Sequence, residues 1–307
     1  SEAGTQPLYS EDGNLVLVFN GEIYNYQTLR EELIAAGHTF TTKSDTEVLL
    51  HGYEQWGVDL LQRVRGMFTF VIWDKNKQEL FGARDHFGIK PFYYAKMNGT
   101  FMYASEIKSL LRHPDFVKEL NAEALKPYMT FQYPAIGETF FKGVYKLPEG
   151  HYFTYRDGKM DIHRYYDEDF REGKQKLGEL VNSIDQTVCD SVKAHQIADV
   201  EVGSFLSSGV DSSYVAAVAR PQHTYSIGFG KGTYNDSQPA GELAELLKLN
   251  NTAESLTDEE AFAAFPRIQW HLDEPDSNPS CVPLYFLSAL AAKDVKVVLS
   301  GEGAGGL

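Results

Sequence analysis

A serine-rich segment has the residue types and the setting of a phosphate-binding loop. Ser207 to Ser213 reads SSGVDSS and lies between the apolar stretch Val200–Leu206 and a helix-forming stretch. Gly209 lets backbone N–H groups approach an anion, the hydroxyls donate to phosphate oxygens, and a helix start adds positive potential. Asp211 offers a carboxylate for the Mg²⁺ that accompanies phosphate groups. A surface turn with a capping aspartate is the alternative, and the strand-before, helix-after setting favours the phosphate site.

A glycine-rich turn near the end of the sequence is a second candidate. Ser300-Gly301-Glu302-Gly303 directly follows the apolar run Val295–Leu299. Doubly wound sheets bind ligands at the carboxyl ends of their strands, so Glu302 is a candidate general base or metal ligand. Taken alone, the motif fits an ordinary turn with a solvated glutamate equally well.

A third candidate follows the apolar run Leu15–Phe19. Asn20 and Gly21 offer a side-chain amide and a bare backbone N–H, which can both donate to a developing oxyanion. The alternative is a type I′ hairpin turn, for which Asn-Gly is the commonest pair. Because the following residues lead into a helix and not into a second strand, both interpretations remain open.

The elements that must position the third candidate are short strands with a few helices. We expect strands at Leu15–Phe19, Met67–Trp73, Glu79–Ala83 and from Pro91 to Ala95. Helices are expected at Tyr26–Ala36 and at Asp45–Trp56, the second capped by Ser44 or Asp45, and a mixed segment at Tyr103–Leu111 ends in a short helix. We also expect a loop at Arg84–Pro91 and a hairpin within Gly143–Tyr155 and the turn Asp157-Gly158.

The second half has a different texture, in which strands alternate with helices. We expect strands at Val200–Leu206, His223–Phe229 and Lys296–Leu299, a loop at Ser207–Ser213, and helices at Leu180–Ala194, Tyr214–Ala219, Pro239–Leu249, Glu260–Leu272 and Leu284–Ala292. Such alternation predicts βαβ units and a parallel sheet. The polar stretch between the two halves, Tyr165–Lys176, predicts a linker.

Bulk properties exclude several classes of protein. The 307 residues are enough for two modest domains, and a net charge of −15 argues against a nucleic-acid partner. The two cysteines, Cys189 and Cys281, form no metal or disulfide pattern, which is typical of the cytoplasm. No stretch is suited to span a bilayer, and Ser1–Tyr9 does not resemble a signal peptide. A homo-oligomer is compatible with the sequence, which does not specify the oligomeric state.

Taken in order, eight segments resemble the class-II glutamine-dependent asparagine synthetases. They are FNGEIYNY, KSDTE, RGMFTFVIWD, ARDHFGIKPFYY, ASEIKSL, FLSSGVDSS, YSIGF and LSGEGA. Related class-II amidotransferases share only the first half, whereas the serine-rich loop is similar to the SGGxDS pyrophosphate loop of ATP pyrophosphatases. This chain departs from the SGGxDS pattern at the second position, where Ser208 replaces glycine.

The resemblance implies two domains. Residues 1–165 should form an α+β N-terminal-nucleophile αββα sandwich of the glutaminase type, residues 166–178 a linker, and residues 179–307 the first part of an α/β doubly wound parallel-sheet ATP-pyrophosphatase domain. The first domain would release ammonia from glutamine. The second would adenylate aspartate with ATP and Mg²⁺, and ammonia would then displace AMP to form asparagine.

The resemblance also assigns residues to these sites. Asn20 and Gly21 match the oxyanion hole, and Glu22 and Asp45 complete the glutamine site. Glu302 takes the catalytic position of the synthetase, and Asp211 is the expected Mg²⁺ ligand. The matching ATP site comprises Leu206, Ser207, Ser208, Gly209, Val210, Asp211, Ser212, Ile227, Gly228, Ser300 and Gly301.

Two positions depart from the family. Its nucleophile is an N-terminal cysteine, whereas this chain begins with Ser1 in a segment that resembles an interior stretch of the family. The family loop continues SGEGADE with a metal-binding Asp, whereas Gly305 and Gly306 follow here. Both ends therefore look cut, and we expect impaired activity of this chain alone. A catalytically inactive remnant that at most binds nucleotide, and an amidotransferase with another acceptor, such as a β-lactam synthetase-like enzyme, are the alternatives.

Overall fold

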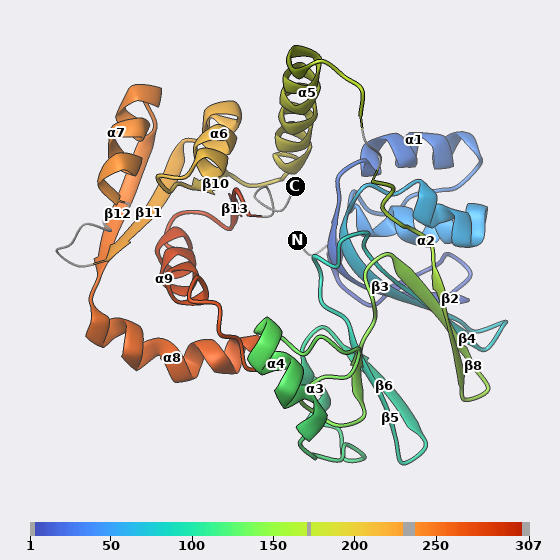
Figure 1. Cartoon of the computed structure of the whole chain (residues 1–307). Coiled ribbons are helices and arrows are strands. Elements are labelled where there is room, and N and C mark those ends of the chain that lie inside the picture. Colours follow the sequence, from blue (N-terminus) through green and yellow to red (C-terminus); the bar gives the residue numbers. More distant parts are fainter. Residues whose placement is uncertain (1–3, 171–172, 230–236, 303–307) are drawn as a thin grey trace. The chain divides into compact units, whose positions relative to one another are not determined.

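The computed structural model describes residues 4–170, 173–229 and 237–302 (Figure 1). The chain divides into two compact units, residues 1–171 and 172–307, and the boundary lies inside the segment 166–178. Ser1 and the residues from Gly303 to Leu307, including Gly305 and Gly306, lie outside the described residues.

A six-stranded antiparallel sheet forms the centre of the first unit. Its order is β1-β2-β3-β4-β8-β9. The strands are β1 (Leu8–Tyr9), β2 (Leu15–Ile23), β3 (Gly66–Asp74), β4 (Glu79–Arg84), β8 (His151–Arg156) and β9 (Lys159–Arg164). Apolar residues alternate along β2 and β3, so each strand sends side chains into cores on both faces of the sheet.

Helices cover one face of this sheet and a second sheet covers the other. The helical elements are α1 (Tyr26–Ala35), α2 (Thr46–Trp56), η2 (Gly57–Gln62), α3 (Ile107–Leu110), η3 (Ala122–Ala124) and α4 (Leu125–Phe131). Leu29 and Leu33 of α1 and Val48 of α2 pack on Leu17 of β2. Val71 and Phe153, on the opposite face, pack against residues of the three-stranded sheet.

The three-stranded sheet has the order β6-β5-β7. Its strands are β5 (Tyr93–Met97), β6 (Thr100–Ala104) and β7 (Val144–Lys146). Tyr94 faces the six-stranded sheet, whereas Ala95 and Met97 pack with Ile107 of α3 on the far side. The layers therefore follow the order α, β, β, α, as expected from the sequence.

Several expectations for the first unit were wrong in detail. The strand expected at Leu15–Phe19 continues to Ile23, so Asn20 and Gly21 lie inside β2 and form no turn. Residue-by-residue pairing with β3 extends from Leu15↔Asp74 to Ile23↔Gly66, and these ladder hydrogen bonds outweigh the local turn preference of Asn-Gly. The expected hairpin exists only between β8 and β9, because β7 pairs with β5 in the other sheet. The short strand β1 was not predicted.

The second unit contains a parallel four-stranded sheet of order β12-β11-β10-β13. Its elements are α5 (Leu177–His195), β10 (Val202–Phe205), α6 (Val210–Ala219), β11 (His223–Phe229), α7 (Ser237–Leu247), β12 (Asn250–Leu256), α8 (Asp258–Leu272), α9 (Cys281–Ala291) and β13 (Val297–Leu299). Strand β12 was missed, because its polar sequence NNTAESL carries no apolar alternation.

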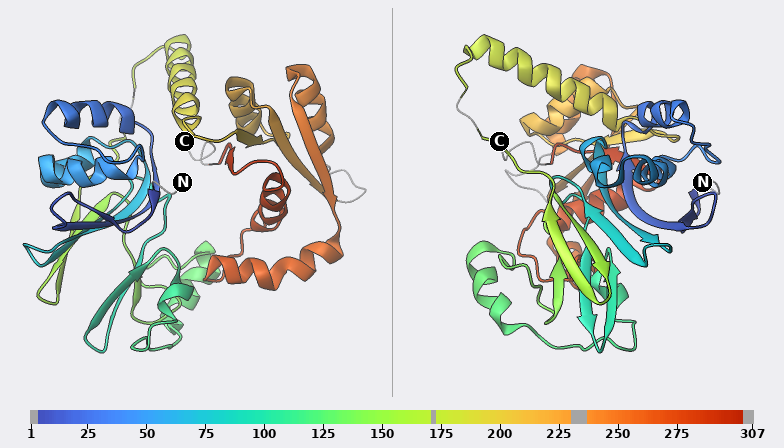
Figure 2. Two further views of the ribbon diagram at one scale, coloured as in Figure 1. Left: turned by 180° about the vertical axis from the view of Figure 1, so that it is seen from behind. Right: turned by 90° about the vertical axis from the view of Figure 1, so that its right-hand side faces the viewer.

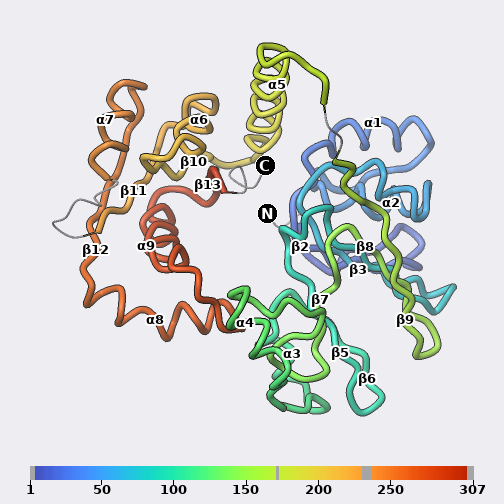
Figure 3. The backbone as a smooth tube through the Cα atoms, in the orientation of Figure 1, coloured from blue at the N-terminus to red at the C-terminus, as the bar shows by residue number. Residues whose placement is uncertain are grey.

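Helices lie on both faces of this sheet, as in doubly wound folds. Helices α5, α6 and α7 pack on one face, and α5 lies beside α6 in Figure 2. Helix α9 packs on the other face through Leu290 against Tyr225 of β11. Figure 3 lets the chain be followed from β10 outward to β12 and then back to β13, on the other side of β10. The order of the sheet therefore reverses between β10 and β13.

Helix α6 begins earlier than expected. Only residues 206–209 form the connection after β10, and Val210 already belongs to the helix, so Asp211, Ser212 and Ser213 lie in its first turn. None of the described helices is long and apolar enough to cross a membrane.

Candidate functional sites

Two loops meet where the order of the parallel sheet reverses. The connection of residues 206–209 leaves β10, and Ser300–Glu302 leaves the neighbouring strand β13. A Cβ atom on Gly301 would lie 2.6 Å from the backbone nitrogen of Ser212, so the second loop lies directly against the first turn of α6. Ligands of doubly wound sheets bind at this kind of crevice.

Hydroxyl groups hold the first loop in shape. Ser207 Oγ and Ser212 Oγ lie 2.7 Å apart, and the backbone N–H of Gly209 donates to Ser207 Oγ at 3.2 Å. Ser213 Oγ donates to the carbonyl of Gly209 at 2.6 Å. Gly209 has an ordinary extended backbone, with φ −74° and ψ 152°, so this loop does not require glycine for its conformation. Its serines therefore hold the loop in place, in addition to offering donors to a ligand.

A cavity of about 570 Å³ opens between these loops and α9. This volume lies in the range of small-molecule sites. Its described lining residues are Phe205, Leu206, Ser207, Gly209, Asp211, Ser212, Ile227, Phe229, Ser280, Pro283, Leu284, Leu287, Ser300, Gly301 and Glu302. They include two carboxylates and no lysine or arginine. A polyphosphate would therefore need a cation beside it.

The cavity gathers most, but not all, of the expected ATP-site residues. Ser208, Val210 and Gly228 do not line it, and the Val210 side chain is 83% exposed. Sequence reasoning missed the apolar wall formed by Pro283, Leu284 and other residues of α9. The sequence of α9 is plainly apolar, but it does not show which face of the parallel sheet the helix covers. That face depends on the crossover connection between strands that are distant in sequence.

The candidate oxyanion residues lie in the first unit on β2. Asn20 pairs with Thr69 and Gly21 with Phe68 of β3. The Asn20 side-chain amide donates to Ser105 Oγ at 3.0 Å, which fixes its orientation beside a cavity of about 170 Å³. That cavity is too small for a drug-sized ligand. Gln6, which we had not singled out, lines it too and exchanges two hydrogen bonds with the backbone of Phe19.

Asp45 is joined to the same strand by its side chain. It occupies the N-cap position of α2 but does not cap the helix, because its carboxylate accepts a hydrogen bond from the backbone N–H of Ile23 at 2.9 Å. Ile23 follows Glu22, so the structure brings Asp45 next to the other residues that are expected to bind glutamine. Ile23 and Asp45 are 22 positions apart in sequence. Burial raises the pKa of the Asp45 carboxyl, and hydrogen bonds from Ile23, Ser44 and Thr46 oppose that rise.

We expect Asp45→Asn to increase the stability of the first unit at neutral pH. With a raised pKa, the folded chain binds more protons than the unfolded chain, so stability falls as pH rises through that pKa. Asparagine keeps an acceptor for the Ile23 N–H but does not ionise, so the variant should not lose stability in this way. Urea unfolding of the wild type and of Asp45→Asn at acidic and neutral pH measures the difference in the free energy of unfolding, with the exposed Asp59→Asn as control. An equal pH dependence in wild type and variant would contradict the expectation.

A loop that we had not assigned to a site is fixed beside β3. The Asp85 carboxylate is fully buried and accepts four backbone hydrogen bonds, from Phe68, Phe87, Ile89 and Lys90. The Arg84 guanidinium donates to three carbonyls, those of Gly88, Lys90 and Leu147. Because Phe68 is opposite Gly21 in the sheet, the segment RDHFGIKP supports the strand that faces the candidate oxyanion residues.

Comparisons with known proteins agree with this architecture. Residues 1–166 match the family model described as a glutamine amidotransferase domain, and residues 183–307 match the model described as asparagine synthase. The two matches divide the chain into a glutamine amidotransferase domain and an asparagine synthase domain. The chain belongs to the glutamine-hydrolysing asparagine synthetase family.

Two relatives come from Bacillus subtilis (strain 168). Asparagine synthetase [glutamine-hydrolyzing] 1 is 43% identical over 308 residues, which cover 99% of this chain and 49% of the relative. Asparagine synthetase [glutamine-hydrolyzing] 3 is 36% identical over 243 residues, which cover 74% of this chain and 39% of the relative. The chain thus spans half or less of the length of either relative.

A solved structure of glutamine phosphoribosylpyrophosphate amidotransferase from B. subtilis matches with a TM-score of 0.38 and 18% identity. The match covers 81% of this chain and 48% of that one. A score this low carries no weight for the fold.

Proposed function

We propose that the protein carrying this sequence makes asparagine from aspartate, ATP and either glutamine or ammonia, through aspartyl-AMP. Residues 1–165 would release ammonia from glutamine, residues 166–178 would link the domains, and residues 179–307 would bind ATP and activate aspartate. The observation that carries the proposal is the contact between Gly301 and the first turn of α6, at the rim of a small-molecule cavity.

The residue types around the cavity fit a magnesium nucleotide. Asp211 and Glu302 place two carboxylates beside loop hydroxyls and the start of α6. Mg²⁺ takes carboxylate and phosphate oxygens, so Asp211 would hold the ion, which would neutralise phosphate charge. The hydroxyls of Ser207 and Ser212 and the helix start would hold the pyrophosphate portion. Ile227 and Leu206 would face the adenosine, and Glu302 would act on the aspartyl group.

In the first domain, Asn20 and Gly21 would donate to the oxyanion formed from the glutamine amide. Glu22 and Asp45 would hold the glutamine α-amino group, since carboxylates pair with ammonium ions. The hydrogen bond from Ile23 to Asp45 supports this role, because it fixes one carboxylate oxygen at the strand that carries Glu22.

The test uses ammonium in place of glutamine, so that it reports only the second domain. The purified protein that carries this sequence is incubated with ATP, Mg²⁺, aspartate and ammonium, and AMP and asparagine are quantified by mass spectrometry. We expect both products in equal amounts, and a loss of about a hundredfold or more in rate for Asp211→Asn. Asp258→Asn, at the exposed start of α8, is the control. AMP release that does not depend on aspartate would contradict the proposal.

A further inference from the structure

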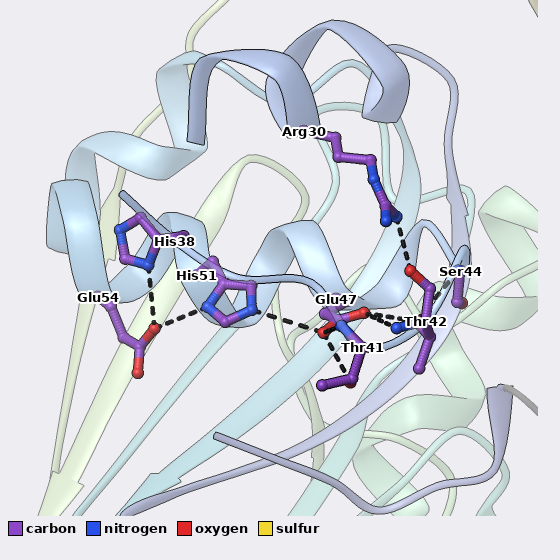
Figure 4. Close-up of polar contacts among 8 residues, drawn as sticks. All are labelled: Arg30, His38, Thr41, Thr42, Ser44, Glu47, His51 and Glu54. Carbon is purple, nitrogen blue, oxygen red and sulfur yellow. Dashed lines mark hydrogen bonds and ion pairs between the residues drawn. The ribbon is translucent and has the colours of Figure 1, made fainter. Parts of the chain in front are cut away.

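Two histidines and a glutamate converge at the helical face of the first unit (Figure 4). His38 lies in the segment after α1, and His51 and Glu54 lie one turn apart on α2. One ligand atom from each lies within 4.8 Å of the other two, and among the described residues this is the one such group of three. Glu54 Oε2 is 2.9 Å from His51 Nδ1 and 3.6 Å from His38 Nδ1.

The other nitrogen of each ring has an acceptor beside it. His38 Nε2 lies 3.0 Å from the Gln55 side-chain oxygen, and His51 Nε2 lies 3.5 Å from a Glu47 carboxylate oxygen. An amide oxygen and a carboxylate only accept, so a ring whose Nε2 carries the proton can donate to these groups. In that neutral tautomer the Nδ1 lone pair is directed at Glu54, whereas the other tautomer of His51 donates to the Glu54 carboxylate at 2.9 Å. Metal-binding histidines are oriented in the same way, with the free nitrogen donating to a carboxylate or carbonyl.

Glu47 is itself firmly held. Its carboxylate accepts hydrogen bonds from the backbone N–H and the hydroxyl of both Thr41 and Thr42, at 2.6–2.9 Å. These donors hold the Glu47 carboxylate beside His51, which is only 3% exposed.

One cation at the point that both Nδ1 atoms and the Glu54 carboxylate face would satisfy all three groups at once. A proton on His51 Nδ1 satisfies one contact, but leaves His38 Nδ1 at 3.6 Å from the same Glu54 oxygen. We propose that His38, His51 and Glu54 bind one Zn²⁺ ion, with the fourth position open to solvent. The side chains of His38 and Glu54 are 18% and 30% exposed, which provides a path for the ion.

Zinc is the ion that this ligand set suits. Imidazole nitrogen and carboxylate oxygen are common zinc ligands, whereas Mg²⁺ and Ca²⁺ prefer oxygen alone. Tetrahedral zinc, with bonds near 2.0–2.2 Å, places its ligand atoms about 3.4 Å apart. The two observed separations, 2.9 and 3.6 Å, need only small side-chain movements to reach that value.

The ion would fasten the segment between α1 and α2 to α2 itself. That segment carries Thr41 and Thr42 and leads directly to Asp45. The backbone carbonyl of Thr42 also accepts a hydrogen bond from the Arg30 guanidinium. A filled site would therefore stabilise the stretch of chain before Asp45. The proposal stands on these contacts alone and does not depend on asparagine synthesis.

The test measures zinc binding by the chelator-stripped protein. Competition with a chromophoric chelator gives the affinity, and the melting temperature with and without zinc gives the effect on stability. We expect one equivalent of Zn²⁺, a higher melting temperature with zinc, and affinity about tenfold to a hundredfold lower in His38→Ala and Glu54→Gln. Both substitutions lie on the accessible side of the site, and circular dichroism checks their folding. His113→Ala is the matched control, because that exposed histidine also lies beside a carboxylate, at 3.9 Å from Asp115.

Cobalt provides a readout on the unsubstituted protein. One equivalent of Co²⁺ should give the intense visible absorption of a four-coordinate site, and Zn²⁺ should displace it. Absence of that band, zinc affinity unchanged in both ligand variants, or an equal loss in His113→Ala would each overturn the proposal.

Discussion

Replacing Gly301 with alanine is expected to abolish ATP-dependent activity while leaving the second unit folded. The added Cβ would lie 2.6 Å from the Ser212 nitrogen and 2.9 Å from the Asp211 carbonyl carbon, and both are backbone atoms in the first turn of α6. Backbone cannot rotate away as a side chain can, so the two loops must separate. Because both loops line the cavity, we expect at least a hundredfold loss in the rate of ammonium-dependent AMP formation.

Gly241→Ala is the matched control for this experiment. Gly241 lies within α7, nothing would lie within 4 Å of its added Cβ, and alanine favours helix, so we expect unchanged activity and equal or higher stability. Isothermal titration with ATP and far-ultraviolet circular dichroism separate a lost site from a lost fold. Normal ATP binding by Gly301→Ala would show that the contact between the loops is not needed for the nucleotide.

The second large effect is expected at Gly21. Its added Cβ would lie 2.1 Å from the carbonyl oxygen of Met67 and 2.7 Å from the Cα of Phe68, which lie on the paired strand β3. β3 is held in turn by β4 and by the hydrogen bond from Phe68 to Asp85, so it cannot move away. We expect Gly21→Ala to lower the free energy of unfolding of the first unit by about 3 kcal/mol or more.

Urea unfolding measures this loss, with Gly137→Ala as the control, since its Cβ would meet nothing within 4 Å. Gly66→Ala should resemble Gly21→Ala, because its Cβ would lie 2.1 Å from the carbonyl oxygen of Glu22 on the same pair of strands. Wild-type stability in Gly21→Ala would mean that β2 and β3 are not closely paired at this position.

Much of the local structure follows from the sequence. The apolar spacing of Leu29 and Leu33 predicted α1, and the alternation of apolar and helix-forming stretches after residue 180 predicted a parallel sheet. Such patterns arise from contacts between near neighbours in the chain, so they can be read without the fold. The ordered motifs likewise indicated the family, which the comparisons confirm.

Other features depended on partners far away in the chain. Asn20 and Gly21 have the local preference of a turn, yet pairing with β3 keeps them in a strand. Asp45 has the local preference of a helix cap, yet its carboxylate turns to the N–H of Ile23. In both cases, a buried backbone group had to be satisfied, and its demand exceeded the local preference.

The sequence by itself determined most of the elements, the two-part organisation and the residue types of the candidate sites. Only the tertiary structure decided which of these residues meet, as with Gly301 against Ser212, and His38 against His51 and Glu54. The physical reason is distance. Hydrogen bonds, metal coordination and steric contact act over a few ångströms, and separation along the chain does not report that distance until strands and helices have packed.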